Sequence, residues 1–256
     1  MIESLQSPHV ARVKALLSSK KDRQAQSLFV AEGLQGVREA LKTREAIETL
    51  YLTQSGSERL SKAGLDVSFV NLVAISEKVA EAMSDAITSQ GIIAICRILN
   101  NDLEKQVAEI SKNHVIYLNE IQDPGNAGTI LRSADAMAIG AVITSPGSVD
   151  FYSPKVVRST AGSLWHIPLL QGIDLDQLRN KLPNHKCYLL TGIGEQDIST
   201  LDFSAPAIWI FGNEARGVQD EISGAKKVSI PMPGNAESLN LAAAASIVMH
   251  QISRGK

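Results

Sequence analysis

The chain has 256 residues, of which 44% are hydrophobic, and its formal net charge is −2. This length and apolar content suffice for one large globular domain or two modest ones. No apolar run approaches the roughly 20 residues of a membrane span, and no signal-peptide pattern opens the sequence, so we expect a cytoplasmic protein without a membrane partner. Its two cysteines, Cys96 and Cys187, lie far apart without metal-type neighbours. We expect reduced packing thiols and no metal site.

Residues 1–30 are expected to be mostly helical and polar, and they carry five cations against two carboxylates, a local balance of +3. The net charge of the whole chain is awkward for a nucleic-acid partner, which usually leaves a basic footprint. This stretch is therefore the candidate nucleic-acid-binding segment, although a solvated helix face explains the same charges. The cations are Arg12, Lys14, Lys20, Lys21 and Arg23.

Residues 30–98 alternate helix and strand patterns, which predicts a compact, smaller α/β domain. Helices are expected at 32–42, 57–63 and 76–83, and strands at 47–53, 67–70 and 91–97. Residues 99–112 lose hydrophobic density and are typical of a linker or a short connecting helix. We therefore place a first domain at 1–98, with the basic segment 1–28 at its start, and a second domain at 113–256.

The second domain alternates apolar strand patterns with helical segments. Strands are expected at 114–119, 141–144, 165–170, 186–191, 207–211 and 228–231. This alternation predicts an α/β fold with a mainly parallel sheet and helices on both faces. In such sheets, ligands bind at the carboxyl ends of the strands.

A Pro- and Gly-rich turn follows the strand at 114–118, and we expect a helix to begin at Ile130. Such a turn allows close approach of a ligand to the backbone, and the side chains of Asn126 and Arg132 are expected to lie along one edge. An ordinary turn with a surface arginine explains the segment equally well.

Two further strands end in polar turns. Glu214 follows the strand at 207–211 and a glycine, which places a carboxylate at the carboxyl edge of the sheet. Ser238 and Asn240 precede a helix of small residues, where unpaired backbone N–H groups are exposed. If the strands are neighbours, the three turns converge on one crevice, which we favour over three independent turns.

Segments 123–132, 211–217 and 230–240 resemble, in order, the three signature motifs of the SpoU (TrmH-type) RNA ribose 2′-O-methyltransferases of the SPOUT superfamily. The resemblance covers residues 114–254, and 29–33 resemble the opening of that family's RNA substrate-binding domain. It implies an S-adenosylmethionine-dependent homodimeric enzyme with a deep trefoil knot in its C-terminal domain and an L30e-like N-terminal domain.

The resemblance also implies roles for individual residues. The polar catalytic set corresponds to Asn126, Arg132, Glu214, Ser238 and Asn240. Cofactor contacts are implied for Thr191, Gly192, Ile210, Gly212, Asn213, Ile230, Met232, Ser238 and Leu239. Arg158 is either an RNA-phosphate contact supplied by the partner subunit or simply a cation at a helix C-terminus.

Methyl transfer from a sulfonium to a ribose hydroxyl needs in-line placement and help in removing a weakly acidic proton. Because a guanidinium stays protonated, we assign Arg132 to phosphate binding and alkoxide stabilisation. Asn126 and Glu214 would hold Arg132 and the ribose in register, and Ser238 and Asn240 would brace the loops and the cofactor.

Family analogy favours 23S-type ribosomal RNA as the substrate over transfer RNA. Two alternatives remain open at this point. The first, methylation of a base nitrogen, is disfavoured by the Asn126/Arg132 pair. The second is a catalytically silent RNA-binding dimer that acts as an assembly factor, which the intact polar set disfavours.

Overall fold

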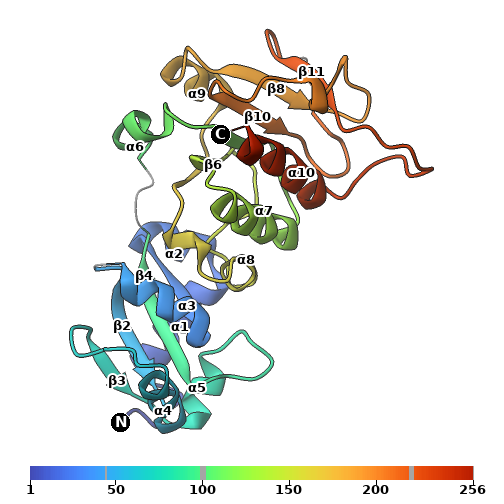
Figure 1. Cartoon of the computed structure of the whole chain (residues 1–256). Helices are drawn as coiled ribbons and strands as arrows, with labels where there is room; N and C mark the ends of the chain where they lie inside the picture. The colour runs from blue at the N-terminus through green and yellow to red at the C-terminus, as the bar shows by residue number, and fades with distance from the viewer. Residues whose placement is uncertain (44, 99–101, 219–221, 256) are drawn as a thin grey trace. The chain divides into compact units, whose positions relative to one another are not determined.

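The computed structural model describes residues 1–43, 45–98, 102–218 and 222–255 (Figure 1). The chain forms two compact units, which we call the N-terminal unit, Met1–Leu99 with Asp150–Trp165, and the C-terminal unit, Asn100–Val149 with His166–Lys256. Of the predicted linker, 99–101 lie outside the described residues, and Leu103–Ile110 form helix α6. In the described part of the chain, no helix is long and apolar enough to span a membrane.

The N-terminal unit contains a four-stranded mixed sheet of order β1-β4-β2-β3, in which β4 is antiparallel to both of its neighbours. The strands are β1 Leu28–Glu32, β2 Ile47–Leu52, β3 Leu72–Ala74 and β4 Ile92–Arg97. Its helices are α1 Pro8–Ser18, α2 Lys20–Gln26, α3 Gly33–Lys42, α4 Gln54–Lys62, α5 Glu77–Ala82 and α8 Pro154–Ser159. Serine and threonine side chains at the N-caps of α1, α2, α4 and α5 accept backbone N–H groups, which explains where these helices begin.

Two strands of this sheet differ from the sequence expectation. Strand β1 falls in the segment expected to be mostly helical; it is a short, almost wholly buried apolar run without polar alternation. The strand expected at 67–70 is instead β3, because the Asp66 carboxylate accepts the Ser68 N–H at 2.9 Å and turns the chain before Leu72.

Residues 150–165 pack into the N-terminal unit although they come from the middle of the sequence expected to form the second domain. The ring of Phe29 in β1 lies 4.9 Å from that of Tyr152 and 5.9 Å from that of Trp165. Ser163–Trp165 form a short 3₁₀ helix, so the strand expected from residue 165 starts only at Leu169.

The C-terminal unit contains a seven-stranded sheet of order β7-β6-β5-β10-β8-β11-β9, and every neighbouring pair is parallel. This confirms the predicted α/β class. The strands are β5 Val115–Leu118, β6 Ala141–Thr144, β7 Leu169–Gln171, β8 Lys186–Leu190, β9 Gln196–Asp197, β10 Ala207–Phe211 and β11 Lys226–Ser229. The sequence does not predict strand β9. Strand β11 begins two residues earlier than expected, at Lys226; the prediction starts too late because lysines are uncommon in strands and two of them open this one.

Helices cover this sheet on two sides. On one face, α6 and α9 Leu175–Lys181 bury Leu103, Ile110 and Leu178 against the strands. On the other face, α7 Pro124–Ala136 and α10 Leu241–Arg254 lie side by side, joined by a 2.9 Å hydrogen bond between the Ser133 and Ser246 hydroxyls (Figure 1). The sheet therefore presents the carboxyl ends of β8, β10 and β11 next to the first turns of α7 and α10. The knot implied by the resemblance stays a prediction.

Candidate active site

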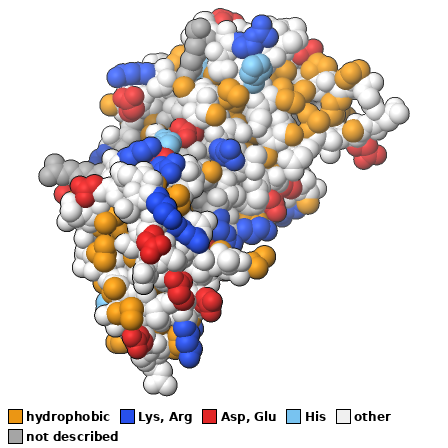
Figure 2. Space-filling model, turned by 60° about the horizontal axis from the view of Figure 1, so that its bottom comes forward, with side chains coloured by type: hydrophobic (Ala, Val, Ile, Leu, Met, Phe, Trp, Pro, Cys, Tyr) orange, Lys and Arg blue, Asp and Glu red, His pale blue; other side chains and the backbone are white. Residues whose placement is uncertain are grey.

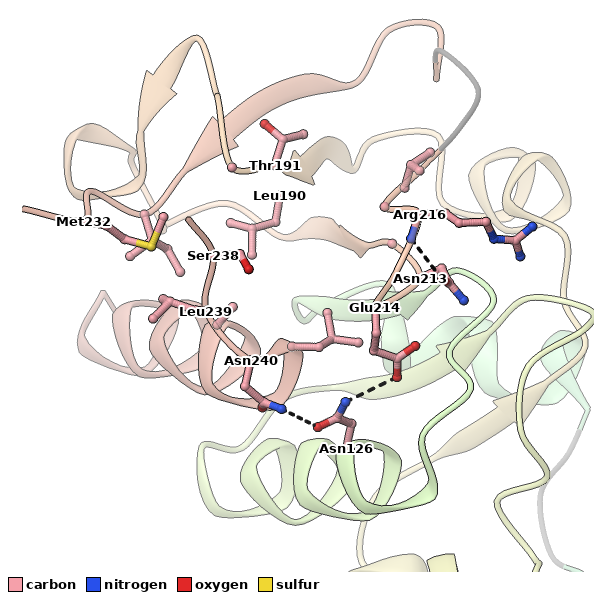
Figure 3. Close-up of a pocket in the computed structure, with 17 residues that line it drawn as sticks. Asn126, Leu190, Thr191, Asn213, Glu214, Arg216, Met232, Ser238, Leu239 and Asn240 are labelled. Atoms are coloured by element: carbon pink, nitrogen blue, oxygen red, sulfur yellow. Dashed lines mark hydrogen bonds between the residues drawn. The ribbon is translucent and has the colours of Figure 1, made fainter. Parts of the chain in front are cut away.

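A cavity of about 540 Å³ opens where β8, β10 and β11 end and α7 and α10 begin (Figure 3). Its walls come from all three segments that carry the motifs and from the loop after β8. Gly212 lets the second segment fold tightly back, because a side chain there would overlap the backbone of Gly217 and Val218. Asn213 and Gly217 close this turn with two backbone hydrogen bonds of 3.0 and 2.8 Å. The cavity therefore exists because the chain makes a turn that only glycine allows.

Glu214 ties the second segment to the start of α7. Its carboxylate accepts the backbone N–H groups of Gln122 at 3.2 Å and Asp123 at 3.1 Å, and the Asn126 Nδ2 at 3.3 Å (Figure 3). Three N–H donors thus converge on one carboxylate. These hydrogen bonds compensate the charge of Glu214, and the side chain links the second motif to the first.

The same chain of hydrogen bonds continues to α10. Asn126 Oδ1 accepts the Asn240 Nδ2 at 2.9 Å (Figure 3). Asn240 Oδ1 caps α10 by accepting the N–H groups of Ala242 and Ala243 at 2.9 and 3.2 Å. These contacts set the orientation of both carboxamides. One continuous polar chain, Glu214–Asn126–Asn240, therefore holds all three motifs together, as the sequence expectation of one crevice requires.

Helix α7 begins earlier than expected. Asp123 caps it by accepting the Asn126 N–H at 2.7 Å, and Pro124 occupies the first helical position, so the helix starts at Pro124 instead of Ile130. The Pro- and Gly-rich residues that suggested a turn form the first turns of the helix. Six residues separate Asn126 from Arg132, which sets them roughly 120° apart around the axis and not on one edge.

Arg132 does not line the cavity. Its side chain is exposed on α7, and it makes no hydrogen bond or ion pair with another residue that the structure describes. Of the expected polar set, the structure brings Asn126, Glu214, Ser238 and Asn240 to the cavity and leaves Arg132 outside it.

The residues expected to contact a cofactor mostly lie at the cavity. Thr191, Gly192, Gly212, Asn213, Ile230, Met232, Ser238 and Leu239 all line it. Ile210 does not, because the alternation of β10 turns its side chain into the core beneath α6 and α9. The Asn213 side chain is occupied by the loop itself: its Nδ2 donates to the Glu120 carbonyl at 2.8 Å, and its Oδ1 accepts the N–H of Arg216 at 3.1 Å.

One buried hydroxyl at the cavity lacks a partner. Thr191 Oγ1 is inaccessible to solvent and makes no hydrogen bond with any described residue. Buried hydroxyls are nearly always hydrogen-bonded, so an orphan on a cavity wall indicates a polar ligand group there. Leu190, Met232 and Leu239 supply apolar walls of the same cavity (Figure 3), and Ile230 also lines it. This combination of apolar walls and a free polar group suits a nucleoside-containing cofactor.

Some residues at the cavity were not singled out from the sequence. They are Leu190, Arg216, Gly217, Val218, Leu241 and Ala244. Arg216 and Gly217 belong to the second motif, so their position in that motif was the available signal. Leu241 and Ala244 sit on the first turn of α10, directly after the Asn240 cap.

The candidate nucleic-acid-binding cations have different environments. Lys14, Lys20 and Lys21 are exposed, and Arg12 pairs with Glu48 at 2.7 Å. Arg23 is buried: it pairs with Asp150 at 2.7 Å and donates to the carbonyls of Leu16 and Leu17. Its place in this interior network excludes it as a surface phosphate contact in this structure.

Arg158 also has partners within the N-terminal unit. Its guanidinium contacts Glu32 and Asp85, each at 2.7 Å. Partial burial opposes the charge, but the hydrogen bonds to the two carboxylates outweigh it and raise the pKa of Arg158. The structure therefore places Arg158 in an ion-pair cluster, and the expected phosphate contact stays a prediction.

Cys96 and Cys187 are buried and not joined, and burial raises the pKa of both thiols. Among the residues that the structure describes, no three His, Cys, Asp or Glu side chains group in a way that could hold a metal ion.

Comparison with known proteins identifies the family. Residues 113–250 match the SpoU rRNA Methylase family, and residues 8–94 match the MRM3-like substrate binding domain. The chain is 31% identical to the 23S rRNA (guanosine(2553)-2′-O)-methyltransferase RlmP of Bacillus subtilis, with 98% of each protein covered. It is 28% identical to the 23S rRNA (uridine(2479)-2′-O)-methyltransferase of Streptomyces viridochromogenes, over 94% of this chain and 88% of that protein.

A solved structure supports the same assignment. The AdoMet bound rRNA methyltransferase from Sinorhizobium meliloti matches with a TM-score of 0.82 at 28% identity, over 99% of this chain and 97% of that one. These matches confirm the resemblance drawn from the three motifs: the chain belongs to the SpoU rRNA methylase family.

Proposed function

We propose that this protein transfers a methyl group from S-adenosylmethionine to a ribose 2′-hydroxyl of ribosomal RNA, and that its substrate is a 23S-type ribosomal RNA. The observation that carries the proposal is the Glu214–Asn126–Asn240 chain, which assembles three motifs around one cavity with an unpartnered Thr191 hydroxyl. The Bacillus subtilis and Streptomyces viridochromogenes relatives, both 23S rRNA 2′-O-methyltransferases by name, support the choice of RNA.

The cavity suits the cofactor. Leu190, Ile230, Met232 and Leu239 would enclose the adenine, and the Thr191 hydroxyl would bond a polar atom of the nucleoside. When bound, S-adenosylmethionine supplies an electrophilic methyl group. The apolar side chains of the cavity would shield part of the cofactor from water, and Gly212 lets the loop after β10 fold tightly enough to form one wall.

The amides of Asn126 and Asn240 are suited to orient the acceptor. Each Nδ2 carries two protons and uses one within the polar chain, so each keeps a second N–H for a ribose or phosphate oxygen. Because their orientations are already set, no reorganisation is needed when RNA binds. Glu214 acts through Asn126, as a positioning residue.

In a homodimer, Arg132 would act at the active site of the partner subunit. Thr129, Arg132 and Ala136 form an exposed stripe on α7, and Ala243 and Ile247 are exposed on the neighbouring helix α10. Figure 2 shows hydrophobic side chains gathered on part of the molecular surface. On α10, the side chain of Ile247 is 36% exposed. We propose that a second copy covers this face. Arg132 would then bind the phosphate next to the target ribose across the interface.

The direct test is a transfer assay with purified protein, methyl-labelled S-adenosylmethionine and separate 23S ribosomal RNA and transfer RNA transcripts. We expect label in the ribosomal RNA, recovered after nuclease digestion as a 2′-O-methylnucleoside. Arg132→Ala should lower transfer about 100-fold or more while the cofactor Kd stays within several-fold. No cofactor binding at millimolar concentration would favour the silent assembly factor, and label on a base would refute ribose chemistry.

A further inference from the structure

We propose that Arg216 binds a phosphate of the RNA substrate at the rim of the cavity, exchanging its ion pair with Glu120 for that phosphate. The inference rests on the proposed function, because it assumes that RNA approaches this cavity. Arg216 is the one lysine or arginine among the described residues that line the cavity. It is therefore the direct source of positive charge at the place where a polyanion must dock.

The geometry directs Arg216 outward. Its backbone N–H donates to Asn213 Oδ1 at 3.1 Å, so the loop holds its Cα in place whatever the side chain does. Figure 3 shows the side chain pointing away from Met232 and Leu239, the part of the cavity assigned to the cofactor. A guanidinium in this position faces an incoming strand and not the bound nucleoside.

The present partner of Arg216 is easily exchanged. Its Nη2 lies 2.8 Å from Glu120 Oε2, and the two side chains are 53% and 47% exposed. Ion pairs this exposed contribute little to stability, because water competes for both charges. A phosphate offers a guanidinium two parallel hydrogen bonds and is the stronger partner.

Glu120 is held in place independently of Arg216. Its backbone N–H donates to Ser145 Oγ at 2.7 Å, its carbonyl accepts Asn213 Nδ2 at 2.8 Å, and its φ is +54°. These contacts keep the backbone of Glu120 at the rim when Arg216 moves or is removed. Without Arg216, the rim would present an unbalanced negative charge to RNA. Glu120 therefore orients the guanidinium of Arg216 until a phosphate of the RNA replaces Glu120 as its partner.

The test measures RNA and cofactor binding separately. With a 23S ribosomal RNA transcript near 0.1 M salt, Arg216→Ala should raise the RNA Kd about five- to tenfold and reduce the slope of log Kd against log salt by roughly 0.7 to 0.9. The Kd for S-adenosylmethionine should stay within about twofold, and Arg216→Lys should recover part of the RNA affinity. Lys105→Ala, which removes an 80% exposed lysine on α6, is the matched control and should change neither quantity.

Glu120→Gln separates charge from packing. It should tighten RNA binding about two- to threefold, and in the Arg216→Ala background it should restore part of the loss. Melting temperatures within about 2 °C of the wild-type value would verify that all variants fold.

Two outcomes overturn the proposal. One is an Arg216→Ala variant that binds RNA like Lys105→Ala. The other is a variant with weakened cofactor binding and unchanged RNA binding, which would assign the guanidinium to the cofactor carboxylate. If the wild-type protein transfers no methyl group to any RNA, the proposed function itself fails; an active wild type with an unaffected Arg216→Ala variant rejects only this inference.

Discussion

Replacing Asp150 by asparagine is expected to destabilise the N-terminal unit strongly. Arg23 is buried in α2, and its guanidinium bonds the Asp150 carboxylate at 2.8 Å through Nε and at 2.7 Å through Nη2. The side chains of Arg23 and Asp150 are only 5% and 11% exposed. Asparagine keeps the shape of the side chain, including the oxygen that accepts the Tyr152 N–H, but removes the charge.

The magnitude follows from the burial. Removing one partner of a buried ion pair leaves the other charge uncompensated and costs about 3 to 5 kcal/mol. The carbonyls of Leu16 and Leu17 still bind the guanidinium, which favours the lower half of that range. For a unit of this size, about 3 kcal/mol lowers the melting temperature by on the order of 10 °C.

Thermal and urea unfolding followed by circular dichroism measure this effect. Lys112→Ala removes one partner of an ion pair whose side chains are 72% and 70% exposed, and it should change stability by less than about 0.5 kcal/mol. The double variant Arg23→Met/Asp150→Asn should lose about 1 to 3 kcal/mol less free energy of unfolding than the two single variants lose together. A loss for Asp150→Asn no larger than that of the control would refute the reasoning.

Three further predictions concern the C-terminal unit. In Glu214→Gln, an amide N–H₂ group faces the backbone N–H donors of Gln122 and Asp123, which it cannot accept. The kcat measured in steady-state kinetics should fall up to about 100-fold. An unchanged kcat would show that this link between the motifs is dispensable. Gly212→Ala forces a methyl group into the Gly217 backbone and should abolish cofactor binding in calorimetry, whereas wild-type affinity would contradict the tight turn. Burial lowers the pKa of His185, and its bond to the Asn113 carbonyl only partly offsets this. Since the unfolded chain then binds more protons below about pH 6.5, stability should be lost as the pH falls through that value, and His185→Gln should flatten this part of the urea-unfolding profile; an identical profile would count against the assignment.

The sequence predicts most of the sheet of the C-terminal unit, because apolar strands alternate with helical segments and the strands β5, β6 and β10 are buried along their whole length. It also predicts which turns meet, because the carboxyl ends of neighbouring parallel strands share one edge. Asn126, Glu214 and Asn240 do meet there.

The partners of these side chains could not be predicted. Asn126 bonds Glu214 across 88 residues and Asn240 across 114, and such pairings depend on loop conformations that no local pattern encodes. The position of Arg132 was wrongly expected for a local reason, since Asp123 and Pro124 start a helix where a turn was read.

The packing of residues 150–165 into the N-terminal unit was also not visible in the sequence. The segment lies between two strands of the C-terminal sheet, and a linear division of the chain assigns it to that domain. Only the contacts of Arg23, Phe29 and Glu32 with Asp150, Tyr152 and Arg158 reveal where it belongs. Charges that looked like a surface patch are in part interior partners of this segment.

The most direct test of the central claim is nucleotide-resolution mass-spectrometric mapping of ribose methylation in ribosomal RNA from cells with and without this chain. We expect one 2′-O-methylnucleotide to disappear from 23S-type RNA when the chain is absent and to return with the wild-type protein but not with Arg132→Ala. Identical ribose methylation in both kinds of cell, or a difference confined to base methylation, would contradict the account.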